Sequence, residues 1–154
     1  MRKALASLVA LGLLVGASAS PALAGKKKTK TISDSVAVTA LPFPNYSSHT
    51  ATPTPGCTAG QEGVHKLSIP IETPGAGKFT AAMAGFTGDW DLYLFDDAGV
   101  IVGRSENAQA DPAMAPAEES IEVALAAKKT YQLVVCNWAG APQATVDYTY
   151  VYKA

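Results

Sequence analysis

The chain has 154 residues and a formal net charge of −1 at pH 7, with 16% charged residues. This length fits one domain with a core of its own. Nucleic-acid binding needs basic groups spread over a face to neutralise phosphates, and this balance does not supply them. We therefore expect no nucleic-acid partner.

The first 24 residues have the features of a secretory signal peptide. Arg2 and Lys3 form a basic start, residues 4–15 are apolar, and residues 22–24 (Ala-Leu-Ala) are a site for signal peptidase. A membrane span needs about 20 apolar residues, and glycine, serine and proline interrupt the run after residue 15. We expect cleavage after Ala24, no membrane span, and a secreted, extracellular protein that starts at Gly25.

Residues 25–63 predict a basic and Pro-rich extended lead-in. Four lysines fall within residues 26–30 and four prolines within residues 42–55. The lysines favour a solvated tail, and attachment to anionic polymers or lipid head groups is the alternative. One early strand is compatible with residues 32–38. We assign residues 64–154 to the folded domain.

The domain that starts at Val64 has the pattern of an all-β fold. Short runs of β-branched and aromatic residues are separated by Gly, Pro and Asp. The expected strands are residues 64–72, 78–86, 90–95, 100–105, 120–126, 131–138 and 145–152. Seven or eight short strands joined by tight turns predict a single antiparallel, jelly-roll-like β-sandwich.

The segment 90–95 shows the alternation of a half-buried strand. Trp90, Leu92 and Leu94 share one face of an extended chain, and the intervening residues share the other. One face is therefore apolar and the other mixed.

The chain contains two cysteines, Cys57 and Cys136. An exported protein meets an oxidising compartment, so we expect them to form a disulfide. Closing a loop of about 80 residues stabilises a fold by about 4.5 kcal/mol in the chain-entropy model. Two separate buried thiols are the alternative.

Several of these segments together resemble a known family. Residues 88–96 (Gly-Asp-Trp-Asp-Leu-Tyr-Leu-Phe-Asp), then Gly99, Val102, residues 131–135 and residues 148–150, are similar to the bacterial pre-peptidase C-terminal domain. The resemblance extends over roughly residues 64–152. It implies a small jelly-roll-like β-sandwich that is usually appended to secreted peptidases and other exported enzymes and is not itself catalytic. No enzyme domain precedes the module in this chain, so we expect no role in processing an attached peptidase.

The resemblance favours a non-catalytic binding or adhesion module whose partner is an extracellular protein or polysaccharide. The two histidines, His49 and His65, stand in no motif for a nucleophile or for zinc. We expect no catalytic residue and no required cofactor. A small secreted hydrolase or protease inhibitor is the alternative function, and it would need an exposed reactive loop such as residues 107–116.

An acidic cluster is the candidate metal site, formed by Asp89, Asp91, Asp96 and Asp97. Calcium accepts several carboxylate and carbonyl oxygens in a flexible geometry, so this cluster predicts calcium binding. The alternative is that Asp96 and Asp97 only form a turn.

The register of the hairpin after residue 95 decides between these interpretations. A four-residue loop would place Arg104 opposite Asp91 and neutralise it. A three-residue loop would place Ser105 opposite Asp91 and Asn107 opposite Asp89, which adds oxygen donors for an ion.

Aromatic residues also recur at alternate positions late in the chain. Such a stripe is most often core, because a buried sheet face requires this period. Trp138 precedes Ala139 and Gly140. Of the aromatic residues, Trp138 is therefore the candidate for exposure and for binding a ligand by stacking on a sugar ring.

Overall fold

The computed structural model describes residues 28–43, 57, 63–107 and 117–154. The predicted signal peptide, His49 and residues 108–116 of the predicted loop lie outside the described residues. Within the described ranges the chain forms strands and turns, and no helix there is long and apolar enough to cross a membrane.

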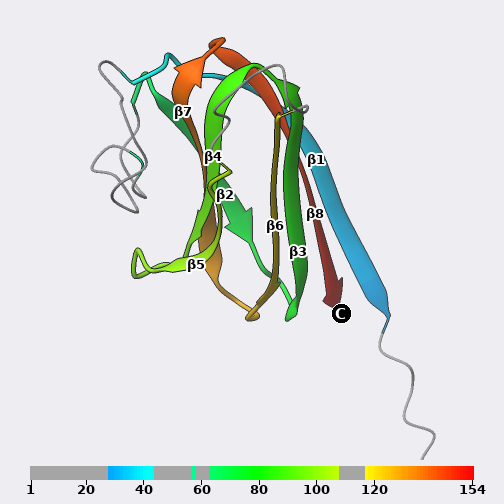
Figure 1. Cartoon of the computed structure of the whole chain (residues 1–154). Coiled ribbons are helices and arrows are strands. Elements are labelled where there is room, and N and C mark those ends of the chain that lie inside the picture. The colour runs from blue at the N-terminus through cyan, green and yellow to red at the C-terminus, as the bar shows by residue number, and fades with distance from the viewer. Residues whose placement is uncertain (1–27, 44–56, 58–62, 108–116) are drawn as a thin grey trace, which may run out of the picture.

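Eight strands form two four-stranded antiparallel sheets (Figure 1). The strands are β1 (Thr29–Thr39), β2 (Lys66–Glu72), β3 (Gly77–Phe86), β4 (Gly88–Phe95), β5 (Ile101–Ser105), β6 (Ala117–Leu125), β7 (Thr130–Gly140) and β8 (Gln143–Lys153). Their order is β1-β8-β3-β6 in one sheet and β2-β7-β4-β5 in the other. The predicted all-β sandwich is confirmed, and a strand forms in every segment where the sequence predicted one.

The pairing of the strands follows one rule. β4 pairs with β5, β3 with β6, β2 with β7, and β1 with β8, all antiparallel. The chain is therefore a long antiparallel ribbon that folds back at the β4–β5 turn and rolls so that successive pairs alternate between the two sheets. This arrangement is the jelly roll, which joins eight strands in two packed sheets.

The sandwich begins earlier in the chain than predicted. β1 pairs with β8 along all 11 of its residues. Near its end, Val38 and the following Ala40 are each only 1% exposed and belong to the main core. The boundary at Val64 is therefore wrong, because β1 is an edge strand of one sheet. Its many Thr and Ser residues gave a weak hydrophobic signal.

The main core lies between the two sheets. Trp90, Leu92 and Leu94 of β4 are fully buried there. Tyr93 and Phe95, on the opposite face of the same strand, belong to a second, smaller cluster on the outside of the β2-β7-β4-β5 sheet. The alternation predicted for residues 90–95 is confirmed.

The second cluster contains the predicted disulfide. Cys57 is bonded to Cys136 of β7 across 79 positions of sequence, and both residues are fully buried. Cys136 lies opposite Asp91 in the β4–β7 register. The disulfide therefore fixes Cys57 to the outer face of this sheet, next to Asp89 and Asp91.

Candidate functional site

The four aspartates of the predicted calcium cluster do not form one site. Asp89 and Asp91 lie at the start of β4, whereas Asp96 and Asp97 follow its end. Asp96 follows Asp91 by five positions of extended chain, a distance of about 16 Å. One cation cannot contact both pairs. In the described ranges, no three acidic, histidine or cysteine side chains converge in a way that could hold a metal.

Asp96 and Asp97 have structural contacts of their own. Oδ1 of Asp96 accepts hydrogen bonds from the backbone N–H groups of Ala98 at 3.0 Å and Val100 at 2.8 Å. Oδ2 of Asp97 accepts a hydrogen bond from Lys129 Nζ at 2.6 Å, which lowers the pKa of Asp97. Asp96 closes the turn, as the alternative interpretation expected, and Asp97 connects that turn to the start of β7.

The β4–β5 turn begins as the predicted three-residue loop, because the Asp96 N–H donates to the carbonyl oxygen of Val100 at 2.9 Å. A bulge at the end of β4 then shifts the register by one residue, so Arg104 lies opposite Tyr93. The expected pair between Arg104 and Asp91 is therefore wrong. The guanidinium of Arg104 instead lies 3.8 Å from Oε2 of Glu106. Ser105 lies opposite Leu92 and not opposite an aspartate.

Asp91 is part of a buried polar network at the start of β4. It is 0% exposed, and its Oδ2 accepts hydrogen bonds from the indole N–H of Trp138 and from the Tyr93 hydroxyl at 3.0 Å. The same hydroxyl lies 2.6 Å from Oε1 of Glu106. Burial and these two carboxylates raise the pKa of Tyr93 above its usual range. A phenol has one proton, so the Tyr93 hydroxyl donates to one of these two carboxylates at a time.

Trp138 is not the exposed aromatic that the sequence predicted. Its side chain is 3% exposed, and its ring stacks on Phe43 with centroids 4.5 Å apart. Phe43 stacks in turn on His65, also at 4.5 Å. The predicted exposure of Trp138 is wrong, because the chain that follows β1 covers it. A flat sugar could not reach its ring in this arrangement.

His65 has a structural partner. Its Nδ1 lies 2.9 Å from the carbonyl oxygen of Leu41. A carbonyl can only accept a hydrogen bond, so Nδ1 carries the proton. Together with its stacking on Phe43, this bond joins the residues before β2 to the segment that follows β1.

A buried carboxylate that sequence reasoning missed lies on β6. Glu119 is 1% exposed, and its Oε1 accepts a hydrogen bond from the backbone N–H of Asn107 at 3.0 Å. Its Oε2 is buried and has no hydrogen-bond partner within the described ranges. Burial, together with the smaller effect of the nearby charges of Asp91 and Asp89, raises the pKa of Glu119 to about 7.

The position of Glu119 explains why the sequence did not reveal it. Glu119 lies opposite Met83, whose side chain faces the core. The strand was predicted to start at Ser120, and β6 begins three residues earlier, at Ala117. With the correct start, period-2 alternation back from Ile121 would have placed Glu119 on the inner face.

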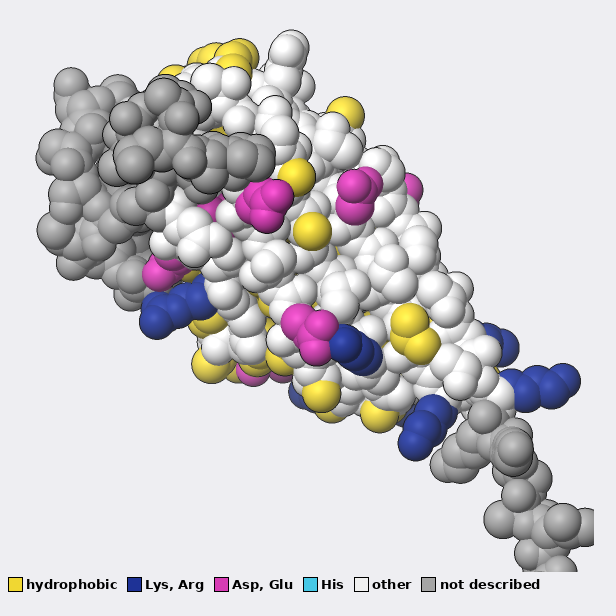
Figure 2. Space-filling view, turned by 45° about the vertical axis from the view of Figure 1, so that its right-hand side comes forward, with side chains coloured by type: hydrophobic (Ala, Val, Ile, Leu, Met, Phe, Trp, Pro, Cys, Tyr) yellow, Lys and Arg dark blue, Asp and Glu magenta, His cyan; other side chains and the backbone are white. Residues whose placement is uncertain are grey.

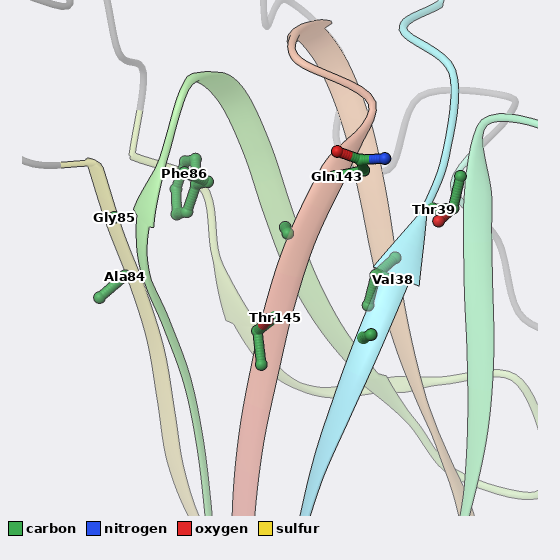
Figure 3. A pocket seen from close by; sticks show the side chains of 9 residues that line it. Val38, Thr39, Ala84, Gly85, Phe86, Gln143 and Thr145 are labelled. Atoms are coloured by element: carbon green, nitrogen blue, oxygen red, sulfur yellow. The ribbon is translucent and has the colours of Figure 1, made fainter.

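A groove of about 440 Å³ opens where β3 separates from β8 (Figure 3). The β3–β8 pairing ends at Met83 and Val146, whereas the β1–β8 pairing continues three residues further, to Gln143. A bulge at Gly85, whose φ is +70°, turns β3 away from β8. A positive φ of this kind is readily adopted by glycine. The groove is lined by Ala37, Val38, Thr39, Ala84, Gly85, Phe86, Gln143, Ala144 and Thr145.

Inside this groove, residues 143–145 of β8 pair with β1 and with no other described strand. The carbonyl oxygen of Pro142 accepts a hydrogen bond from Ala40 N–H, so the backbone of residue 142 points toward β1. Backbone direction alternates along an antiparallel strand, and the N–H and C=O groups of Gln143 therefore point toward the groove. The lining side chains are uncharged, and most are small.

These features define a jelly-roll β-sandwich with a groove in one sheet and a buried carboxylate network in the other. No family model matches this chain, and comparison with curated proteins also finds no match. The resemblance to the pre-peptidase C-terminal domain therefore stays a prediction based on residues 88–96 and the later strands.

Proposed function

We propose that this chain is a secreted, non-catalytic binding module that holds an extended segment of an extracellular protein in the β3–β8 groove. The observation that supports this function is that residues 143–145 of β8, which precede Val146, pair with β1 and leave their other edge open toward the groove. An exposed strand edge binds an extended peptide through main-chain hydrogen bonds, and neighbouring pockets select its side chains.

The lining of the groove favours a peptide over a polysaccharide. Sugar rings commonly stack on flat, exposed aromatic side chains, and the one aromatic residue in the lining, Phe86, is only 9% exposed. Ala37 and Ala84 leave room for a backbone to approach the sheet closely. The lining carries no charge, so the segment that fits best is extended and uncharged, with small or β-branched side chains.

Secretion is the second part of the proposal. Residues 1–24 have the pattern of a signal peptide, and the disulfide is compatible with an extracellular protein. Intact-mass analysis of protein recovered from the culture medium should give a chain that starts at Gly25. A secreted protein that retains residues 1–24 would contradict this part.

The binding site can be tested with peptides selected from a phage-displayed random library. The test variant is Ala84→Trp, which places a large side chain at an exposed position of the groove lining. The matched control is Ala82→Trp, because Ala82 is exposed on the same face of the same strand and does not line the groove. Selected peptides should bind the wild type and the control equally, and the groove variant at least about tenfold more weakly, a difference of about 1.4 kcal/mol.

Two results would overturn this function. Peptide binding that is equal in both tryptophan variants would place the binding site outside the groove. A robust activity in broad hydrolase and protease-inhibition assays would show that the protein is an enzyme or an inhibitor. A polysaccharide panel in a thermal-shift assay completes the comparison, because a ligand that binds only the folded state raises the melting temperature.

A further inference from the structure

In the part of the chain that the structure describes, β1 is a long sheet edge without the usual protection against pairing. Among the described strands it has β8 as its one neighbour in the sheet, and it extends over 11 residues and pairs without a bulge. Its first seven residues are exposed, although they include both faces of the strand. Natural proteins commonly protect such edges with prolines, bulges, short strands or covering segments. β1 contains no proline, and its one lysine is Lys30, the second residue of the strand.

The backbone groups on the free edge can be assigned from two hydrogen bonds. Ala40 N–H donates to the carbonyl oxygen of Pro142, and the carbonyl of Lys28 accepts from Ala154 N–H, so the backbone N–H and C=O groups of even-numbered β1 residues point toward β8. The backbone groups of the odd-numbered residues therefore point away from β8, to the free edge. These residues are all small and uncharged: Thr29, Thr31, Ser33, Ser35, Ala37 and Thr39. Of these, Ser35 donates its N–H locally to Asp34 Oδ1 at 2.8 Å.

We propose that β1 pairs antiparallel with β1 of a second copy of this chain, about a two-fold axis at Ile32. This register places Lys30 opposite Asp34 of the second copy, and the symmetry repeats the pair. It also places the two Ile32 side chains, each 40% exposed in the single chain, against each other. Opposite charges and apolar pairs directly across two strands are favourable.

Other registers are less favourable. Hydrogen bonds between the two copies need an odd-numbered residue of one β1 opposite an odd-numbered residue of the other. The two-fold axis must therefore pass through a residue and not between two residues. An axis at Lys30 or at Asp34 would place like charges opposite each other, which is destabilising. An axis at Thr31 or Ser33 would place Ile32 opposite a charged side chain. The axis at Ile32 places opposite charges against each other and the two apolar Ile32 side chains against each other.

The arrangement also separates the most basic parts of the two copies. Lys28, Lys30 and Lys153 lie at one end of the β1–β8 ribbon, where Figure 2 shows basic side chains gathered. Antiparallel pairing at Ile32 moves the two Lys28 residues to opposite ends, about 26 Å apart along the strands. This exceeds the screening length of about 8 Å at physiological ionic strength, so their repulsion is small. The β1-β8-β3-β6 sheets of the two copies would then form one continuous sheet.

The pairing can be tested by measuring the mass of the secreted protein by light scattering after size exclusion, up to about 500 µM because an edge interface of this size is weak. The wild type should form a dimer. Lys30→Asp and Asp34→Lys should each be monomeric, because each creates like-charge pairs. Mixing the two variants should restore the dimer, since every opposed pair in the mixed species again has opposite charges. The double variant Lys30→Asp/Asp34→Lys should also dimerise.

Two controls distinguish pairing from other effects. Lys78→Asp makes the same change of charge at an exposed position on β3 and should leave the dimer intact. Thr31→Pro removes an outward N–H without removing a bond to β8, and it should give a folded monomer. A monomeric wild type, or single charge variants that dimerise like the wild type, would overturn the proposal. So would a mixture of the two variants that stays monomeric. None of these outcomes depends on the β3–β8 groove.

Discussion

Tyr93 and Glu106 lie 13 positions apart in sequence, and the hydroxyl of Tyr93 is 2.6 Å from Oε1 of Glu106. The same hydroxyl reaches Asp91. This one buried donor therefore connects β4 to the residues that follow β5. The hydroxyl is shared by two carboxylates, so its removal takes a hydrogen-bond donor away from Asp91 and Glu106 together.

Replacing Tyr93 by phenylalanine should lower the free energy of unfolding by about 1 to 3 kcal/mol, the cost of removing a hydrogen bond to a buried carboxylate. Urea denaturation followed by fluorescence measures this change. Tyr152→Phe is the control, because Tyr152 lies partly exposed near the end of β8, and the change there should stay within about 0.5 kcal/mol. Equal stability of the two variants would show that the Tyr93 hydroxyl contributes little.

Glu119 should make the protein more stable in mild acid. Its pKa is raised to about 7 in the folded state, so the folded chain binds this proton more tightly than the unfolded chain. The stabilisation is fully present below the usual carboxyl pKa and is lost as the pH rises through about 7. A pKa shift of this size lowers the free energy of unfolding by about 3 kcal/mol between pH 4 and pH 8.

Glu119→Gln should remove this contribution and stabilise the protein at pH 8 relative to the wild type. Chemical denaturation at both pH values measures the difference. Glu118→Gln is the neighbouring control, because Glu118 is exposed and the change should leave the pH dependence as it is. If the wild type and Glu119→Gln depend equally on pH, Glu119 does not bind a proton more tightly in the folded state.

Calcium binding stays a prediction, and the structure restricts where it can be tested. Asp89, which is 9% exposed, is the residue to replace, because Asp91 also accepts hydrogen bonds within the buried network. We expect about 10 mM calcium to raise the melting temperature modestly at pH 8, and Asp89→Asn to abolish the rise. Asp97→Asn should keep it, since Asp97 pairs with Lys129 at the other end of β4. Identical melting curves in calcium and in chelator would exclude a calcium site.

Loss of the disulfide should destabilise the protein strongly. The Cys57→Ala/Cys136→Ala variant should have a free energy of unfolding about 4 kcal/mol below that of the oxidised wild type, because the unfolded chain regains the freedom of a long loop. Reductant should lower the stability of the wild type and leave the variant unchanged. A variant as stable as the oxidised protein would show that the bond does not limit the unfolded chain.

The sequence by itself determined the all-β class, the places of the strands and the cysteine pair. These features depend on local signals. The alternation of Trp90, Leu92 and Leu94 sets the two faces of β4 whatever its neighbours are. The cysteine pairing was expected from the number of cysteines together with the predicted secretion.

The tertiary structure decided the sheet membership of β1, the burial of Trp138 and the partners of the aspartates. A polar edge strand such as β1 carries little hydrophobic signal, and its place depends on β8, more than 100 residues later. Trp138 is covered by Phe43, which no local pattern near either residue indicates. The residue opposite Tyr93 depends on a bulge beyond the β4–β5 turn, and a register shift of one residue changes which side chains meet. Contacts between distant segments are fixed only when the ribbon has rolled into its two sheets, and local patterns cannot predict them.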